Sequence, residues 1–403
     1  MTLRDQPWLA SQETRAVITA LEAEGGRGCV RFVGGCVRNA LLDQPVDDLD
    51  LATPLTPERS MKALKAAGLK VVPTGLAHGT VTAVSGGRPY EITTLRRDVE
   101  TDGRRAVVAF TDDWAEDAAR RDFRLNALYA DADGTIFDPT GEGLADVAAG
   151  RIVFVGDAGT RIREDYLRIL RFFRFHAWYG RGEPDVAGLK ASAELAAGVR
   201  TLSAERVSKE LLKLLAAPDP RPAVRAMVEV GVMAEVLPEA EPLTLFEAMV
   251  ERTDDAALRL SALLPTEADA ITSAATRLRL ANALRNRLVA AVGDISRGLE
   301  EPGVRAMLYA IGRDAFRDRL TRVAASGAVD AAETGRLKAV ADSWVRPKMP
   351  VGGREVARAG LAAGPETGRV LKAFEDSWIA DDFPVTGHDE RLKAAIRTLS
   401  GPS

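Results

Sequence analysis

The sequence predicts an α+β head of about 150 residues followed by an all-helical remainder. Three observations carry this prediction. Short β-rich runs occur only before residue 96, alanine- and leucine-rich patterns with helical spacing dominate from about residue 155, and prolines divide that second half into stretches of ordinary helix length. The 403 residues are a length typical of two to three domains.

The head alternates helical and strand patterns. Apolar residues at helical spacing predict a helix over 10–24, and Thr56, followed by a proline and a glutamate, is typical of a helix start. The other expected elements are, in order, a strand over 29–33, a helix over 37–42, a strand around 49–51, a helix over 57–68, and strands over 69–72, 80–84 and 90–95. Residues 96–111 are charged and lack periodicity, which predicts a mobile loop.

The helical remainder is divided by proline-containing stretches, at each of which we expect a helix to end. They lie at 218–222, 238, 265, 302–303 and 347–353. Together with the change to purely helical patterns near residue 155, they predict four segments: 1–154, 155–217, 218–345 and 346–403.

Composition excludes several classes of protein. The chain is 46% hydrophobic and 28% charged, which excludes a disordered or low-complexity protein. No stretch is long and apolar enough to span a membrane, and the first ten residues do not resemble a secretory signal. Two cysteines, Cys29 and Cys36, are too few for a disulfide framework, so we expect a cytoplasmic protein. The net charge of −4 gives no reason to expect a polyanionic partner.

A pair of carboxylates is the densest chemical pattern in the head. Asp48 and Asp50 alternate with Leu49 and Leu51, so on a strand both carboxylates share one face. Neighbouring acids repel each other, and oxygen ligands of this kind suit Mg²⁺. The pair is therefore a candidate magnesium site.

A glycine pair, Gly34 and Gly35, precedes these acids at the end of a predicted strand and the start of a helix. Backbone N–H groups there can approach a phosphate, and Arg38 lies one turn into the helix. Taken singly, a glycine pair is usually a turn and an Asp-x-Asp is common on solvated strands. Because Gly35 and Asp48 are only 13 residues apart with an arginine between them, we favour phosphoryl or nucleotidyl transfer.

The second pattern is an arginine-rich helix over 161–175. Asp165 and Arg168 are three residues apart, so on one helix they would be neighbours, and Arg171 and Arg174 extend the row. Residues 151–175 contain six arginines and three acids. An aspartate and an arginine can pose hydrogen bonds to the edge of a nucleobase while further arginines reach phosphates. A solvated helix face with internal ion pairs is the open alternative.

These patterns in this order resemble class II of the tRNA nucleotidyltransferase and poly(A) polymerase family, within the polymerase-beta superfamily. The segments that carry the resemblance are 34–53 (GGCVRNALLDQPVDDLDLAT), 75–81 (GLAHGTV), 91–96 (EITTLR), 120–127 (RRDFRLNA), 138–141 (DPTG) and 164–174 (EDYLRILRFFR). The resemblance implies a polymerase-beta-like nucleotidyltransferase head over 1–154, followed by a helical neck, body and tail over the other three segments.

The resemblance also implies roles for individual residues. Asp48 and Asp50 would bind Mg²⁺. The phosphates of the nucleotide would be contacted by Gly34, Gly35 and Arg38, and Arg121 would also bind the nucleotide. Asp165 and Arg168 would read the base, and Arg171 and Arg174 would complete the nucleotide contacts. The implied reaction adds C, C and A from CTP and ATP to the 3′ end of tRNA and releases pyrophosphate. Expected partners are tRNA, ATP and CTP, with neither a membrane nor DNA.

The chain departs from the family pattern at three places. Asn39, Asp43 and Tyr166 stand where the family usually has Asp, Gly and Pro. We expect Asn39 to remove one negative charge near the metals, and we interpret Glu91 as a structural acid rather than a third metal ligand.

Other activities remain open at this point. They are a poly(A) polymerase, an enzyme that adds only CC or only A, and an RNA-binding scaffold with an inactive head. The 75–81 segment resembles the CCA-adding branch, and a lost 96–110 loop would indicate CC addition only. Near the 360–364 turn, Arg354, Arg358 and Arg369 are candidate tRNA contacts, with an ordinary helix hinge as the alternative.

Overall fold

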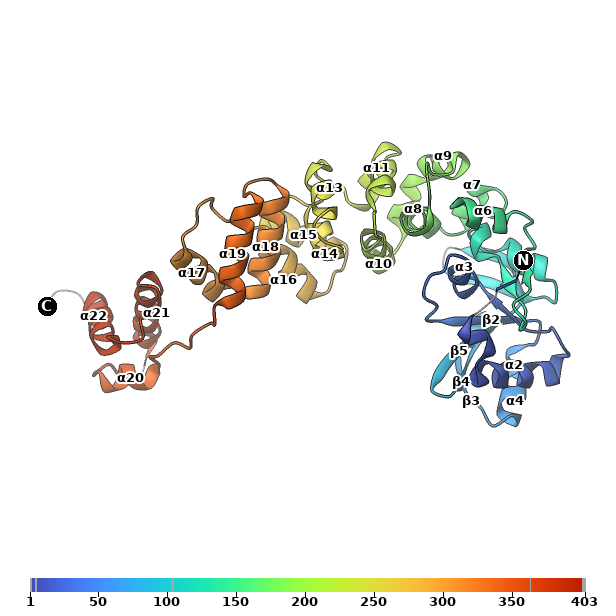
Figure 1. Ribbon diagram of the computed structural model, residues 1–403, viewed down its shortest axis with the longest axis horizontal. Helices are drawn as coiled ribbons and strands as arrows, with labels where there is room; N and C mark the ends of the chain where they lie inside the picture. The colour runs from blue at the N-terminus through green and yellow to red at the C-terminus, as the bar shows by residue number, and fades with distance from the viewer. Residues whose placement is uncertain (1, 4–5, 103–104, 363, 401–403) are drawn as a thin grey trace. The chain divides into compact units, whose positions relative to one another are not determined.

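The computed structural model describes residues 2–3, 6–102, 105–362 and 364–400 (Figure 1). The chain forms two compact units, residues 1–240 and residues 241–403. The first unit contains every named strand and the second is helical. This confirms the predicted α+β head with a helical remainder. Among the described helices, none has the length and apolar character needed to cross a membrane.

A seven-stranded mixed sheet organises the first unit, in the order β3-β4-β5-β2-β1-β8-β9. The strands are β1 (Arg31–Val33), β2 (Leu49–Thr53), β3 (Lys70–Gly75), β4 (Thr80–Ser85), β5 (Arg88–Thr94), β8 (Tyr129–Ala130) and β9 (Ile136–Phe137). Strand β2 pairs antiparallel with β1 on one side and parallel with β5 on the other. The strand that carries Asp50 is therefore interior to the sheet.

The helices expected in the head over 10–24, 37–42 and 57–68 are all present, together with others that the patterns did not predict. They are α1 (Pro7–Ala10), α2 (Gln12–Gly25), α3 (Gly35–Leu41), α4 (Pro57–Ala66), η1 (Leu76–His78), α5 (Trp114–Ala119), η2 (Arg124–Asn126), α6 (Gly143–Ala149), α7 (Ala158–Glu164), α8 (Leu167–Tyr179), α9 (Val186–Glu194), η3 (Ala196–Thr201), α10 (Ala204–Leu215), α11 (Arg221–Glu229) and α12 (Val232–Val236). The side chain of Thr56 caps α4 by accepting a hydrogen bond from the Arg59 amide.

Two expectations for this unit were wrong, and two short strands were not predicted. The predicted loop over 96–111 is a two-stranded hairpin of β6 (Arg96–Asp102) and β7 (Arg105–Phe110), a sheet of its own. A ribbon held by its own backbone pairing needs no alternation of apolar residues. The two-residue strands β8 and β9 are too short to give a sequence pattern. The helix expected over 161–175 is broken at Asp165, whose φ of −157° is extended.

Aromatic packing joins α8 to the sheet portion of the first unit. Phe123 is fully buried and lies 4.8 Å from Phe154 and 5.1 Å from Phe175 between ring centroids. Phe154 stacks on Phe172 at 5.6 Å. Because these rings come from both the head and α8, burial of their surface fixes the helix against the head.

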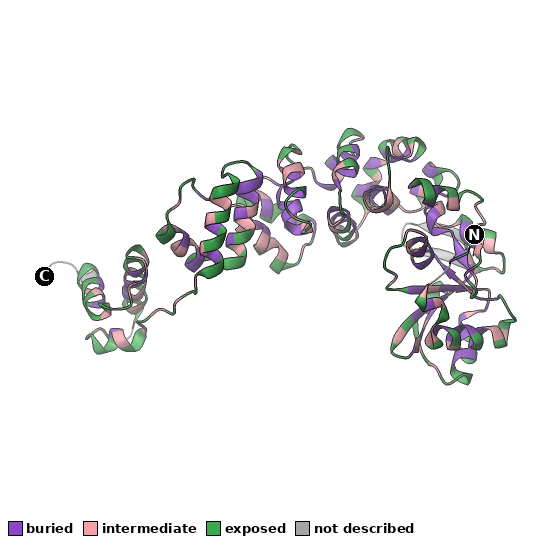
Figure 2. Cartoon of the chain, in the orientation of Figure 1, coloured by how far each residue is buried: buried purple, intermediate pink, exposed green. Residues whose placement is uncertain are grey.

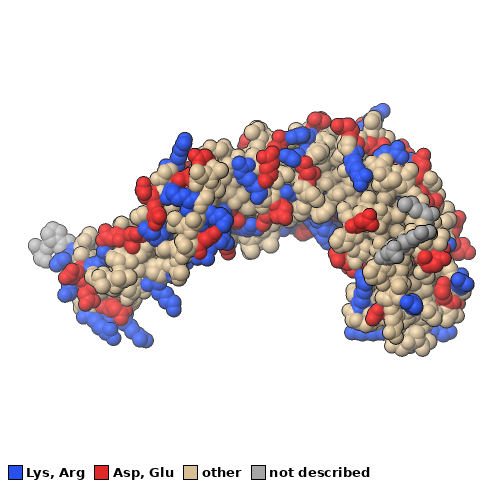
Figure 3. All heavy atoms as spheres, viewed as in Figure 1, with Lys and Arg blue, Asp and Glu red and all other residues tan. Residues whose placement is uncertain are grey.

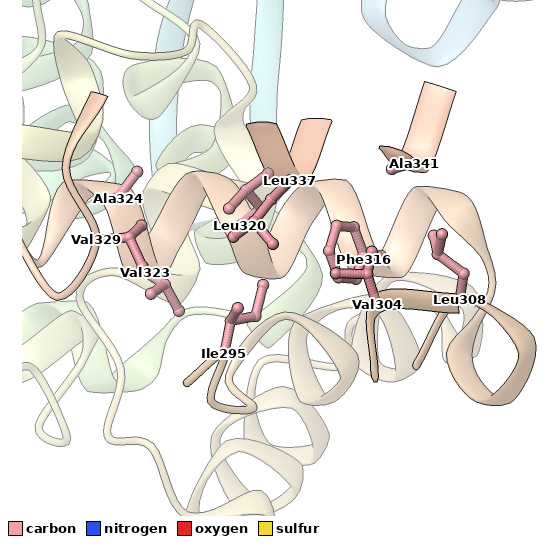
Figure 4. Packing of buried hydrophobic residues seen from close by; sticks show 10 residues of the cluster. All are labelled: Ile295, Val304, Leu308, Phe316, Leu320, Val323, Ala324, Val329, Leu337 and Ala341. Carbon is pink, nitrogen blue, oxygen red and sulfur yellow. The ribbon is translucent and has the colours of Figure 1, made fainter. Parts of the chain in front are cut away.

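The second unit consists of helical hairpins around two apolar clusters. Its helices are α13 (Thr244–Val250), α14 (Ala256–Ser261), α15 (Ala268–Arg277), α16 (Asn282–Ala291), α17 (Glu301–Ile311), α18 (Arg313–Ala325), α19 (Ala331–Ser343), α20 (Gly353–Arg358), α21 (Pro365–Ala380) and α22 (His388–Ser400). One cluster, shown in Figure 4, surrounds Phe316 and Leu320 of α18. The other surrounds Phe374 and Trp378 of α21. The buried faces of these helices alternate with exposed ones in Figure 2.

Candidate nucleotidyl-transfer site

The turn between β1 and α3 depends on Gly34. Its backbone has φ 72° and ψ −119°, a conformation that residues with a side chain rarely adopt. A Cβ placed on Gly34 would find the Nη1 atom of Arg121 at 3.6 Å as its nearest neighbour. The turn therefore presents backbone to an arginine from another segment, which is suited to a bound anion.

Three carboxylates line one cavity of about 410 Å³. They belong to Asp48, Asp50 and Glu91, and Leu49, Thr82 and Pro89 complete the lining. Asp50 and Glu91 are register partners in the parallel β2–β5 ladder. Burial, together with the charges of Glu91 and Asp48, raises the pKa of Asp50 to about 6, although the charge of Arg121 acts in the opposite direction. The cavity thus holds an excess of negative charge that Arg121 offsets only in part.

The donor chemistry of this cavity fits a divalent metal ion. Carboxylate oxygens are hard ligands, and they come from Asp48, directly before β2, and from Asp50, the second residue of that strand. Within the described ranges, no three acid, histidine or cysteine side chains are grouped closely enough to hold a metal on their own. A site of two carboxylates is adequate for an ion that takes its other ligands from water and substrate phosphate.

Arg38 lies inside the protein rather than at an open phosphate site. Its side chain donates from Nη1 to Asn126 Oδ1 at 2.6 Å and from Nη2 to the Tyr179 hydroxyl at 2.9 Å. It also donates from Nε and Nη2 to Asn39 Oδ1. The residue is 7% exposed, and burial lowers the pKa of its guanidinium. In this conformation Arg38 links α3 to the end of α8.

Asn39 is directed to Arg38 and to the backbone. Besides accepting from Arg38, it donates from Nδ2 to the Pro45 carbonyl at 2.8 Å. The amide can accept and donate at once, which a carboxylate cannot do. Asn39, which stands where the family usually has an aspartate, therefore connects Arg38 to the backbone at Pro45.

Arg121 is held by a buried acid and keeps one donor free. Its Nη2 lies 3.0 Å from Asp117, and Tyr129 donates to the same carboxylate at 2.7 Å. Burial alone would raise the pKa of Asp117, but the charges of Arg121 and Arg120 lower it to about 2. The Nη1 group, which makes no hydrogen bond within the described part of the chain, faces Gly34. Arg121 is thus positioned to bind an anion at the turn.

Asp165 and Arg168 lie at the break between α7 and α8, and each has a different partner. Asp165 Oδ1 accepts from the Leu167 amide and Oδ2 forms a 2.6 Å ion pair with Arg206 of α10. Arg168 forms a 2.5 Å ion pair with Glu164 and donates to two backbone carbonyls. Asp165 and Arg168 do not lie on one continuous helix, because α8 begins only at Leu167, but they remain neighbours: the Arg168 amide donates to the Asp165 carbonyl at 2.9 Å.

Arg171 and Arg174 extend along α8 and are both anchored. Arg171 donates from Nε and Nη2 to Asp122 at 2.8 and 2.5 Å, and Arg174 pairs with Glu210 of α10 at 2.5 Å. Burial would raise the pKa of Asp122, but Arg171 and the Asn126 amide lower it to about 2. The arginine row is therefore oriented by acids of two other segments.

Arg354, Arg358 and Arg369 lie in the second unit, on exposed helix surface. Arg358 pairs with Glu355 at 3.5 Å and Arg369 with Glu366 at 3.1 Å, each within its own helix. Such exposed pairs contribute little to stability, so the side chains can exchange partners.

The sequence patterns missed the residues that orient the site. Asp117 and Asp122 are buried acids that hold arginines, and Asn126 connects Asp122 to Arg38. One signal was available: in 120–127 an acid, Asp122, directly follows two arginines. Tyr179, 141 residues from Arg38, gave no signal.

The sequence of this chain is similar to those of known proteins. Residues 30–153 match the family described as "Poly A polymerase head domain", and residues 187–244 match the one described as "Probable RNA and SrmB- binding site of polymerase A". The "CCA tRNA nucleotidyltransferase 1, mitochondrial" of Mus musculus is 34% identical over 358 residues, covering 85% of this chain and 81% of the relative.

Two bacterial proteins extend the likeness along the chain. The "CCA-adding enzyme" of Levilactobacillus brevis is 30% identical over 377 residues, covering 89% of this chain and 90% of the relative. The crystal structure of the Bacillus stearothermophilus CCA-adding enzyme in complex with CTP aligns with a TM-score of 0.77 at 27% identity, covering 98% of this chain and 99% of that one.

Proposed function

This chain belongs to the tRNA nucleotidyltransferase family that includes the CCA-adding enzymes, and we propose that it adds C, C and A to the 3′ end of tRNA. The nucleotides come from CTP and ATP, and pyrophosphate is released. The single observation that carries the proposal is the cavity lined by Asp48, Asp50 and Glu91. Arg121, whose charge acts on Asp50 and whose Nη1 group faces Gly34, connects this excess of carboxylate with the backbone turn.

The reaction is an attack of the RNA 3′-hydroxyl on the α-phosphate of the nucleotide. We assign Asp48 and Asp50 as ligands of Mg²⁺, which when bound stabilises negative charge on the attacking and leaving oxygens. The Gly34 turn and the free Nη1 of Arg121 bind phosphate oxygens, and Asp117 keeps that arginine in place. The negative charge that develops on the triphosphate is thus stabilised by hydrogen-bond donors that are already held in position.

Selection of the base is assigned to the region where α7 meets α8. Asp165 can accept from the exocyclic amino group that cytosine and adenine share, and Arg168 can donate to a ring acceptor. Their partners Arg206 and Glu164 fix both side chains before the nucleotide arrives. Uracil and guanine, which present a carbonyl at that position, would face the Asp165 carboxylate with the wrong polarity.

Incubation of the purified protein with CTP, ATP and a tRNA that lacks its terminal CCA tests the proposal. We expect restoration of C-C-A, read at single-nucleotide resolution. Poly(A) tails on unrelated RNA would instead identify a poly(A) polymerase, and arrest after CC a partial enzyme. The mouse relative is mitochondrial by name, so cytoplasmic localisation stays a prediction.

A further inference from the structure

A buried arginine without a hydrogen-bond partner lies in the second unit. Arg322 of α18 is 9% exposed, and its Nε atom is buried and makes no hydrogen bond. Burial lowers the pKa of this guanidinium. A buried cation without partners opposes folding, so its presence calls for an explanation.

Arg319, three residues earlier on the same helix, lies in a related environment. It donates from Nε and Nη2 to the Ala290 carbonyl at the end of α16, at 3.2 and 3.0 Å. A Cβ on Gly293 would lie 2.0 Å from the Arg319 Cζ, so only glycine leaves room for the guanidinium there. Burial lowers the pKa of this side chain as well.

The charges around the two arginines do not balance. The carboxylate that acts on both is Asp294, which is exposed, and it forms no ion pair with either one among the described residues. Arg317, also on α18, is by contrast paired with Asp342 at 2.5 Å. Arg319, Arg322 and Asp294 together carry one positive charge in excess, and within the described residues the Arg322 side chain makes no hydrogen bond.

Other buried arginines of the described chain are satisfied. Arg38, at 7% exposure, makes hydrogen bonds to Asn126, Asn39 and Tyr179. Arg259, at 2% exposure, donates to the Thr253 carbonyl. Arg322 therefore differs from them in lacking an internal acceptor, which indicates an acceptor from outside the protein.

We propose that Arg319 and Arg322 form a subsite for a backbone phosphate of the RNA substrate. The inference rests on the proposed function, which supplies an RNA partner. A guanidinium fork matches phosphate geometry, and partial desolvation strengthens the contact. Structured RNA is bound largely through phosphates and shape, so one fixed phosphate position helps to set the register of the RNA.

The test measures affinity for tRNA lacking CCA as a function of salt concentration, using the full chain. Arg322→Met and Arg319→Met are compared with Arg317→Met, which removes the same charge from the same helix. We expect the first two to weaken binding roughly tenfold and to reduce the slope of log affinity against log salt by about one unit. Arg317→Met should leave the slope unchanged.

Thermal unfolding separates a binding role from a structural one. Replacing an unpaired buried cation by methionine should leave the midpoint of Arg322→Met equal to or above that of the parent. A lowered midpoint with an unchanged salt slope would show a structural arginine and overturn the proposal. Arg322→Gln provides a second variant if the methionine protein does not fold.

Two further results distinguish other outcomes. The first uses inorganic phosphate, with chloride at equal ionic strength as the control. If phosphate alone stabilises the parent but not Arg322→Met, and the slope of log tRNA affinity against log salt is unchanged in the variant, the site binds a free anion and the RNA subsite is wrong. If the parent binds tRNA and restores C-C-A but all three variants lose slope equally, only the subsite fails. Absence of incorporation by the parent would count against the proposed function instead.

Discussion

Asp50 is a partly buried carboxylate that shares its cavity with two other acids. Its register partner Glu91 and its neighbour Asp48, together with partial burial, raise the pKa of Asp50 to about 6. Repulsion of this kind destabilises the folded protein until a cation is bound. The proposed role of Asp50 as a Mg²⁺ ligand therefore predicts that metal binding increases stability.

Replacing Asp50 by asparagine should separate stability from activity. In a chelator, Asp50→Asn is expected to raise the thermal midpoint because the repulsion is removed. Added Mg²⁺ should stabilise the parent but not the variant, and nucleotide incorporation should fall roughly a thousandfold or more. Asp112→Asn, at an exposed carboxylate, is the control and should behave as the parent does. Equal stabilisation of both variants by Mg²⁺ would contradict the assignment.

Asp117 predicts a pH dependence of stability. Its folded pKa of about 2 lies below the unfolded value of 3.8, so the stabilisation is complete above about pH 4 and is lost as pH falls towards 2. The difference corresponds to about 2 kcal/mol of unfolding free energy. Asp117→Asn should flatten the dependence between pH 4 and pH 2, measured by chemical denaturation at each pH. If the unfolding free energy of Asp117→Asn depends on pH as steeply as that of Asp112→Asn, Asp117 is not the source of this pH dependence.

At the residue scale, the sequence predicted which side chains are near the site better than what they contact. The carboxylate pair and the glycine turn were noted from their spacing, the two carboxylates line one cavity, and Gly34 adopts the expected turn at the start of α3. The partners of Arg38 come from segments far along the chain, which no local pattern encodes. Asp43, where the family has glycine, has φ 53°, so the aspartate adopts the left-handed backbone that glycine favours.

At the scale of elements, the break between α7 and α8 matters most. Because the helix is broken at Asp165, its side chain accepts a hydrogen bond from the Leu167 amide, the first of α8, and contacts α10 through Arg206. Helical spacing in a sequence cannot reveal such a break, because the residues on both sides of it continue the same pattern. The hairpin β6–β7 was missed for a related reason, since its pairing is purely internal.

Arg206→Met should release Asp165 from α10. We expect the KM for CTP and for ATP to rise roughly tenfold and misincorporation of UTP to increase, because the carboxylate loses its fixed orientation. Affinity for tRNA should not change. Arg200→Met, which removes the exposed ion pair with Glu235, is the matched control. Unaltered selectivity with unaltered KM would show that Arg206 does not position Asp165.

At the scale of the whole molecule, the net charge of −4 is a poor guide to the partner. On the face seen in Figure 3, Lys and Arg side chains are interspersed with Asp and Glu, so an overall sum averages local excesses away. The inferences about RNA rest on particular arginines, those of α8 and α18, and on whether acids nearby satisfy them.

The two compact units predict separable stabilities. Phe316 is fully buried in the cluster of Figure 4, so Phe316→Ala should cost about 3–5 kcal/mol in the second unit. Calorimetry should show one transition shifted to lower temperature and the other unchanged. Tyr166→Ala, whose ring packs against Gly198 in the first unit, should shift the other transition. A single shared shift for both variants would mean that the units unfold as one.

Strand β2 is hydrogen-bonded along both of its edges, to β1 and to β5. A strand held in two ladders cannot slide without breaking both, so the proposed Mg²⁺ ligands on β2, and with them the point where a new bond would form, are stationary. If three nucleotides are joined at that point in turn, the RNA end has to retreat by one nucleotide after every addition. Growth of the product is then a translocation of the RNA past an immobile reaction centre, and its limit is set by how far the RNA can be moved.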